Sequence, residues 1–251
     1  DFTYCLKTIN SSRIATIVND RKHKLSGNLI IPDNVEYNGV KYHVYDAEYE
    51  VFDNCPELIS LTTAMTKFPG MGNSDNLTSL ELREGVTFLE SSIDCNKLES
   101  IELPKSVISV SQVSGSSTIK TIRFKNPNTF DYQLSFGYPE EWLNALTDIY
   151  FASPFAPKLD LRSIGVFPVN SHVTIHVPDG AKANYEAGGW AGWNIVEDQE
   201  LPTEQTIECG YCTGTETAQY GWAQDCGNNH GELAIRVLPE MLASFVGKPI
   251  T

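Results

Sequence analysis

The sequence predicts a mostly β, α+β fold made of stacked repeats, because one six-residue pattern recurs at a fixed interval. The pattern occurs at Leu77–Leu82, Leu98–Leu103 and Ile119–Phe124, and successive copies start 21 residues apart. Apolar and polar residues alternate over the last four positions of each copy, which predicts a short strand with one buried and one exposed side. A fixed interval of this length is typical of a solenoid, in which each unit buries its apolar edge against the next.

Fainter copies of the pattern lie on both sides of these three. Leu58–Thr63 starts 19 residues before Leu77, Leu146–Phe151 starts 27 residues after Ile119, and His172–Val177 starts 26 residues later again. The sequence therefore predicts about six units, with longer connections toward the C-terminal end.

A small residue stands three positions before four of the apolar anchors, as Cys55, Ser74, Cys95 and Ser116. The unit from Cys95 to Val107 reads C-x-x-L-x-x-I-x-L-P-x-x-V, and it resembles the BspA-like leucine-rich repeats of secreted and surface proteins of gut and oral Bacteroidetes. The resemblance covers roughly residues 20–198, and it implies an irregular leucine-rich repeat solenoid of a secreted or surface-anchored bacterial protein. Because Cys55 and Cys95 hold equivalent positions, we interpret both as buried small apolar residues rather than as a disulfide pair.

The two ends of the array carry their own signals. Residues 1–20 predict two strands around the turn at Asn10, a hairpin expected to cover the open edge of the first repeat. Residues 25–45 predict a strand that ends at Pro32 and a second hairpin at Asn38-Gly39. Residues 178–197 resemble the usual C-terminal cap of BspA-like arrays, a short helix followed by a strand, in which Trp190 and Trp193 fill the core.

Three segments follow from these signals: a repeat domain over 1–200, a linker over 201–205 and a different module over 206–251. The last segment resembles the start of a β-sandwich module common in secreted Bacteroidetes proteins. Its 46 residues are few for such a module, so we expect it to be incomplete, and the start at Asp1 without a signal peptide indicates a mature or trimmed product.

Composition excludes several classes of partner. The formal net charge is −14, which argues against nucleic acid and anionic membrane surfaces. No apolar run approaches the roughly 18 residues of a membrane span.

The strongest metal-like pattern lies in the last segment, where Cys209, Cys212, Cys226 and His230 have the count of a Cys3His zinc site. One disulfide among the three cysteines and unmodified thiols are the alternatives, and we assign no metal and no cofactor. No nucleotide-binding, hydrolase or zinc-protease motif is present, so we do not expect an enzyme.

The exposed side of the predicted strands is the candidate binding surface. Residues on either side of the fourth-position apolar residue face outward and form two columns. The candidate partner-binding residues are Ser79, Glu81, Ser100, Glu102, Thr121, Arg123, Asp148, Tyr150, Thr174 and His176, and Ser60 and Thr62 extend the columns upstream.

The graded chemistry of the second column favours a protein partner, such as a host or bacterial surface or matrix protein, for an adhesin-like protein. A solvated face without a partner is the alternative. The aromatic segment 126–145 leaves a second hypothesis open, a carbohydrate-binding accessory using Tyr132, Tyr138 and Trp142 with Tyr150. The third hypothesis is a spacer domain of a larger secreted enzyme.

Overall fold

The computed structural model describes residues 2–18, 24–91, 93–110, 118–128, 145–157 and 172–200, together with four short strands between residues 205 and 237. The chain is mostly β, as the sequence predicts, and its described helices are confined to residues 182–190.

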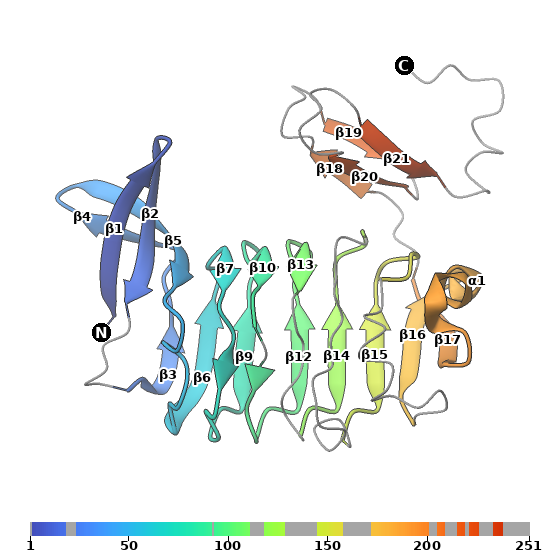
Figure 1. The fold of residues 1–251 in the computed structure, drawn as a ribbon, viewed down its shortest axis with the longest axis horizontal. Helices are drawn as coiled ribbons and strands as arrows, with labels where there is room; N and C mark the ends of the chain where they lie inside the picture. Colours follow the sequence, from blue (N-terminus) through green and yellow to red (C-terminus); the bar gives the residue numbers. More distant parts are fainter. Residues whose placement is uncertain are drawn as a thin grey trace.

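Every one of the six predicted units contributes one strand to a row of parallel strands, which we call the main ladder (Figure 1). The six strands are β6 (Glu57–Thr63), β9 (Ser79–Leu82), β12 (Ser100–Leu103), β14 (Thr121–Phe124), β15 (Asp148–Phe151) and β16 (Thr174–Pro178). One further strand extends the ladder at each end, β3 (Ser26–Ile30) beside β6 and β17 (Asn194–Gln199) beside β16.

The alternation of each unit fixes which side chains face the core. In β12 and β14 the second and fourth residues are buried, whereas the first and third face outward. Because parallel pairing is in register, the buried second residues form one continuous row, which includes Ile101, Ile122, Ile149 and Ile175.

The main ladder is interrupted at one place. Its strands form two sheets, β3-β6-β9 and β12-β14-β15-β16-β17, and among the described residues no strand pairing joins β9 to β12. The interval between these two units is the regular 21 residues, so the interruption does not come from a longer connection. Leu80 of β9 is accordingly only half-buried, unlike its counterpart Ile101.

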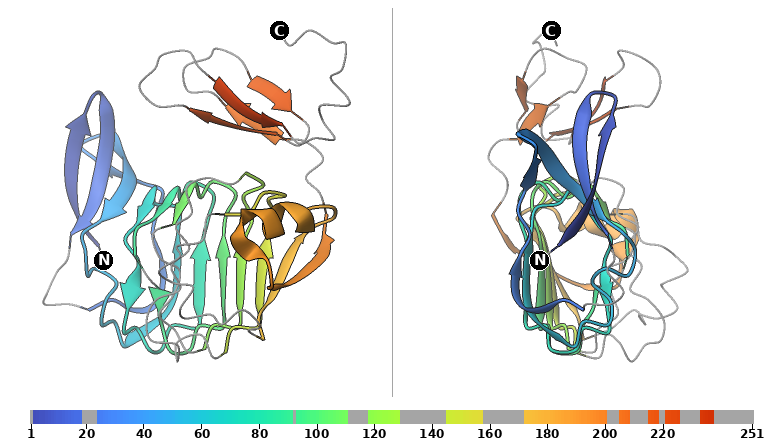
Figure 2. Two further views of the ribbon diagram at one scale, coloured as in Figure 1. Left: turned by 45° about the vertical axis from the view of Figure 1, so that its right-hand side comes forward. Right: turned by 90° about the vertical axis from the view of Figure 1, so that its left-hand side faces the viewer.

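Short strands lie on the other sides of the turns that begin with β6, β9 and β12, and the end-on view of Figure 2 shows the chain closing around the core. One row pairs β7 (Lys67–Phe68), β10 (Phe88–Leu89) and β13 (Ser109–Val110), and another pairs β8 (Met71–Gly72) with β11 (Ile93–Asp94). The row that contains β10 and β13 remains paired where β9 and β12 do not, and it holds the two halves of the array together.

The N-terminal strands form a separate four-stranded sheet in the order β1-β2-β5-β4. The predicted hairpins are present, β1 (Thr3–Ile9) with β2 (Ser12–Val18), and β4 (Asn34–Tyr37) with β5 (Val40–Ala47). The first hairpin was expected to cover the open edge of the first repeat, but β2 pairs with β5 instead of β3. Ala15 and Ile17 of β2 are buried in the core, and Tyr4 and Leu6 of β1, with Phe2 just before it, are partly buried against it.

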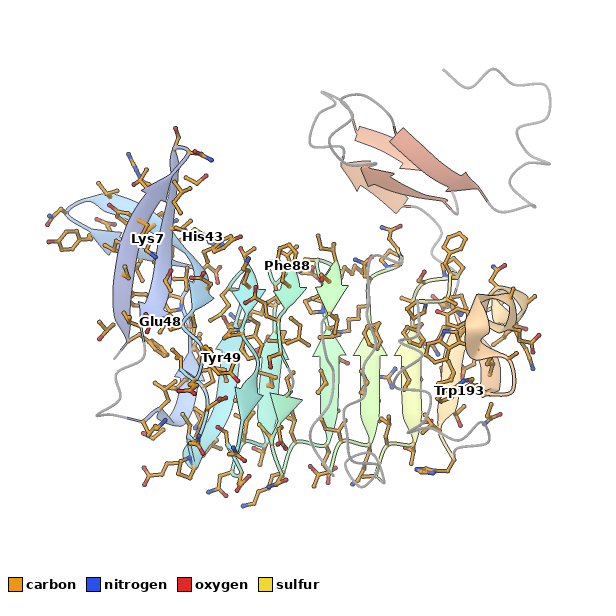
Figure 3. All side chains as sticks on the ribbon, in the orientation of Figure 1. Lys7, His43, Glu48, Tyr49, Phe88 and Trp193 are labelled. Carbon is orange, nitrogen blue, oxygen red and sulfur yellow. The ribbon has the colours of Figure 1, made fainter. Side chains whose placement is uncertain are left out.

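The C-terminal end of the core is closed by α1 (Lys182–Tyr185) and the helical turn η2 (Glu186–Trp190). Tyr185 and Trp190 are fully buried, which confirms Trp190 as a core residue, while Trp193 is half-buried against the same cluster beside α1 (Figure 3). Trp190 meets Phe151 edge to face at 5.5 Å between ring centroids and donates its indole N–H to the carbonyl oxygen of Pro157 at 3.1 Å.

Cys55 and Cys95 are buried thiols, as predicted, and Ser74 occupies the equivalent position between them. The Ser74 hydroxyl accepts the backbone N–H of Cys55 at 3.2 Å and donates to the carbonyl oxygen of Phe52 at 2.8 Å. Burial raises the pKa of the Cys95 thiol to about 12, so that thiol is protonated at neutral pH.

Beyond residue 200 the structure describes two antiparallel strand pairs. These are β18 (Gln205–Glu208) with β19 (Thr215–Ala218), and β20 (Gly221–Asp225) with β21 (Leu233–Val237). Gln205, assigned by sequence to the linker, already lies in β18, while Cys209, Cys212, Cys226 and His230 lie outside the described residues. Of the helices that the structure describes, none is long and apolar enough to cross a bilayer.

Candidate functional site: the exposed face of the main ladder

All ten candidate residues lie on the outward side of the main ladder, exposed or half-buried. Within each half of the ladder the predicted columns are in register. Thr121, Asp148 and Thr174 are neighbours in the first column, and the second column runs through Glu102, Arg123, Tyr150 and His176. The interruption between β9 and β12 separates Ser79 and Glu81 from the next members, Ser100 and Glu102.

The second column contains a stack of three flat side chains from β14, β15 and β16. The Arg123 guanidinium carbon lies 3.5 Å from the centroid of the Tyr150 ring. The His176 ring is stacked on Tyr150 with centroids 4.0 Å apart and planes 9° from parallel. Because β14 and β16 flank β15 on opposite sides, Arg123 and His176 cover the two faces of the Tyr150 ring.

Carboxylates hold both ends of this stack. At one end Glu102 lies 4.0 Å from the Nε of Arg123 and also contacts the Nζ of Lys125. At the other end, His176 Nε2 lies 2.9 Å from Oδ1 of Asp148, and Nδ1 lies 2.7 Å from Oδ2 of Asp198. A neutral imidazole carries one N–H, so both contacts become hydrogen bonds to carboxylates only when the ring carries both protons.

The pKa values of Asp148 and Asp198 are both lowered, which favours their ionised forms. Burial alone would raise the pKa of Asp148, but hydrogen bonds from Thr147 and His176, with the attraction of nearby positive charge, outweigh burial and lower that pKa. The pKa of Asp198 is lowered in the same way, against the effect of burial, by hydrogen bonds from Gln199 and His176. The stack is therefore a row of side chains in mutual contact across three strands, with carboxylates at both of its ends.

The upstream half of the second column has a smaller network. Thr62 donates to Oε2 of Glu81 at 3.1 Å, and the Nε of Arg83 donates to Oε1 of the same carboxylate at 3.1 Å. The hydrogen bonds from Arg83 and Thr62 lower the pKa of Glu81. Glu81 and Glu102 thus stand in neighbouring positions on either side of the interruption, and each carboxylate has its own basic partners within its half.

The first column is built from small side chains linked across strands. Ser60 donates to the amide oxygen of Asn28 at 2.8 Å, and the amide nitrogen of Asn194 donates to the Thr174 hydroxyl at 3.0 Å. The first column is thus a row of short polar side chains, mostly hydroxyl and amide groups with the Asp148 carboxylate among them, and it lies beside the longer charged and aromatic side chains of the second column.

Sequence reasoning missed three participants in this surface. Asp198 and Val196 belong to β17, which the sequence indicated only as a closing strand, and Asn28 belongs to β3. Their signal was present, since Asn28-Leu29-Ile30 and Asn194-Ile195-Val196 repeat the polar–apolar spacing of the inner units.

The geometry also bears on two other possible functions of this surface, sugar binding and metal binding. Tyr150 offers no open ring face for sugar stacking, because Arg123 and His176 cover both faces. Tyr132, Tyr138 and Trp142 lie outside the described residues. In the part of the chain that the structure describes, no group of three or more His, Cys, Asp or Glu side chains is arranged to hold a metal ion. Asp148 and Asp198 contact opposite nitrogens of His176, so these three residues do not converge on one point.

Comparisons with known proteins do not assign a family. No protein-family model matches the chain, and no curated protein matches it. Among solved structures, the chain is similar to a leucine-rich repeat protein from Bacteroides ovatus, with 13% sequence identity and a TM-score of 0.32. The likeness covers 72% of this chain and 64% of the other, so the chain spans less than two thirds of that protein.

Proposed function

We propose that the chain is a BspA-type leucine-rich repeat solenoid that acts as a non-catalytic, adhesin-like binding protein, secreted or held at the bacterial surface. Its ligand is a protein, which binds across the two columns of the main ladder. The observation that carries the proposal is the preorganised stack of Glu102, Arg123, Tyr150 and His176, which presents charge and aromatic edges on rigid strands.

Three physical features support a protein ligand. The columns extend over neighbouring parallel strands, which suits a long contact rather than a small pocket. Side chains held by stacking and ion pairs lose little freedom on binding, so less free energy is spent on ordering them. Arginine and tyrosine are also the residue types most enriched among residues that dominate protein–protein binding energy.

Surface plasmon resonance against immobilised fibronectin, laminin and collagen tests this proposal. Charge reversal by Glu102→Lys or Arg123→Glu is expected to weaken binding at least about tenfold, which corresponds to roughly 1.4 kcal/mol. Lys105→Glu is the matched control, because Lys105 is exposed in a turn outside the two columns. Binding that is equally strong in all three variants would show that the ladder face is not the contact surface.

A glycan array on the same preparations separates the carbohydrate hypothesis from this one. We expect no glycan binding that depends on Arg123 or Tyr150, because the Tyr150 ring is covered on both faces. Glycan binding that survives Arg123→Glu and coincides with no protein binding would favour the carbohydrate-binding accessory.

A further inference from the structure

Among the described residues, the strand at each end of the main ladder is paired on one side only. In the described residues, β3 pairs only with β6, and β17 pairs only with β16. Backbone N–H and C=O groups on such an edge are available to another strand. Because every pairing in the main ladder is parallel, β3 and β17 run in the same direction. Their outer edges face outward at opposite ends of the row of strands.

The side chains of the two edge strands also match position by position. Asn28, Leu29 and Ile30 occupy the first column, the core row and the second column beside Ser60, Leu61 and Thr62. Asn194, Ile195 and Val196 occupy the same three rows beside Thr174, Ile175 and His176. The sequences of the two edges are therefore equivalent in register and in chemistry.

We propose that β17 of one copy of this chain pairs in parallel with β3 of a second copy, so that the main ladder continues from molecule to molecule. This register brings Asn194 opposite Asn28, and two amides can hydrogen-bond because each both donates and accepts. It also brings Val196 opposite Ile30, which are otherwise exposed apolar side chains, at 37% and 66%.

Charge favours this head-to-tail contact over contacts between identical ends. The described residues between 2 and 47 include four basic and three acidic residues, whereas residues 172–200 contain one basic and five acidic residues. The strand β17 carries the adjacent acids Glu197 and Asp198, so pairing two β17 strands would place like charges together. The opposite charge balance of the two ends steers β17 toward β3.

The association is expected to be weak, because one strand pair is a small contact beside the roughly 1,600 Å² of a standard interface. Sedimentation velocity of the full chain, up to on the order of 1 mM protein, should show mass above the 27.8 kDa monomer that rises with concentration and falls with added salt. A monomer at every concentration would overturn the proposal.

Two single-substitution variants, and a mixture of the two, test whether the contact joins the β17 edge of one copy to the β3 edge of another. Ile30→Lys disables the β3 end and Val196→Lys disables the β17 end, and each variant alone is expected to remain monomeric. An equimolar mixture retains one intact edge of each kind and should form dimers but nothing larger. A mixture that stays monomeric while the wild type associates would show that the contact uses other surfaces.

Matched controls exclude misfolding and unspecific effects. Ile30 and Val196 are already exposed, so lysine at either position should leave the circular dichroism spectrum and thermal midpoint unchanged. Ile9→Lys changes an isoleucine on the N-terminal hairpin whose exposure, 52%, lies between those of Val196 and Ile30, and this variant should associate like the wild type. Loss of association in Ile9→Lys would contradict the assignment of the contact to β3 and β17.

Discussion

Replacing Trp190 with alanine tests whether the C-terminal end of the array is a packed core. The side chain is fully buried, it lies 5.5 Å from Phe151 and 6.1 Å from Tyr185 between ring centroids, and its N–H is hydrogen-bonded to Pro157. Truncating a buried tryptophan costs about 3–5 kcal/mol, from lost burial and the cavity left behind. The unpaired carbonyl oxygen of Pro157 adds on the order of 1 kcal/mol.

A loss of this size is a large share of the roughly 5–15 kcal/mol that stabilises a typical domain. Urea unfolding followed by far-ultraviolet circular dichroism should therefore show a clearly lower midpoint for Trp190→Ala. Because each unit of a repeat array contacts only its neighbours, a separate early transition of the last strands is an equivalent result.

The matched control is Tyr49→Ala, which removes an aromatic ring that is 70% exposed and should change stability by less than about 0.5 kcal/mol. Trp190→Phe keeps a ring in the cavity but removes the indole N–H, so its loss should fall between the other two. If Trp190→Ala cost no more than Tyr49→Ala, the reasoning that α1 and η2 close the core would be wrong.

Three further perturbations have definite expected outcomes. Gly188→Ala would place its methyl group 2.6 Å from the Cβ of Ala156, so we expect a loss of about 1–3 kcal/mol in urea unfolding, and an unchanged midpoint would contradict this packing. The lowered pKa values of Asp148 and Asp198 contribute stability that is present above the unfolded pKa, near 3.9, and lost as pH falls through the folded values. Unfolding midpoints measured from pH 6 to pH 3 should fall, and the fall should be shallower in Asp198→Asn. The buried thiol of Cys95, with a pKa of about 12, should react with a thiol reagent only after unfolding, and rapid labelling of the folded protein would show that its site is open.

Residue spacing predicted the repeating part of the fold because periodicity and register are local properties of the sequence. The 21-residue interval placed Glu102 and Arg123 in one column, and the structure has them directly opposite each other. The outward side of each strand followed from alternation, since a strand turns successive side chains to opposite faces. The burial of Cys55 and Cys95 followed from their equivalent positions in two units.

Other features depend on pairing choices that no local pattern encodes. Alternation identified β1 and β2 as strands, but not that β2 would pair with β5 rather than cover β3. The interruption between β9 and β12 lies between two units at the regular 21-residue interval, so the spacing did not predict it. The like-charged Glu81 and Glu102 lie on its two sides.

The contacts of His176 were also beyond the sequence. They require the register of β17, which places Asp198 near the ring although 22 residues separate the two in the chain. Stacking of Arg123 on Tyr150 similarly depends on side-chain rotamers, which alternation does not specify.

The interruption in the main ladder has a mechanical consequence. Tension applied along the row of strands is carried by the backbone hydrogen bonds between neighbours, because those bonds lie across the strands. Between β9 and β12 that load passes instead to contacts on the other sides of the turn. These include the two-residue pairing of β10 with β13, the Glu84 carboxylate, which accepts the backbone N–H groups of Lys105 and Ser106, and the Ser106 hydroxyl, which donates to the carbonyl oxygen of Val86. Under stretching force the array should part first at this point, leaving a three-stranded piece and a five-stranded piece that each keep their own half of the exposed face.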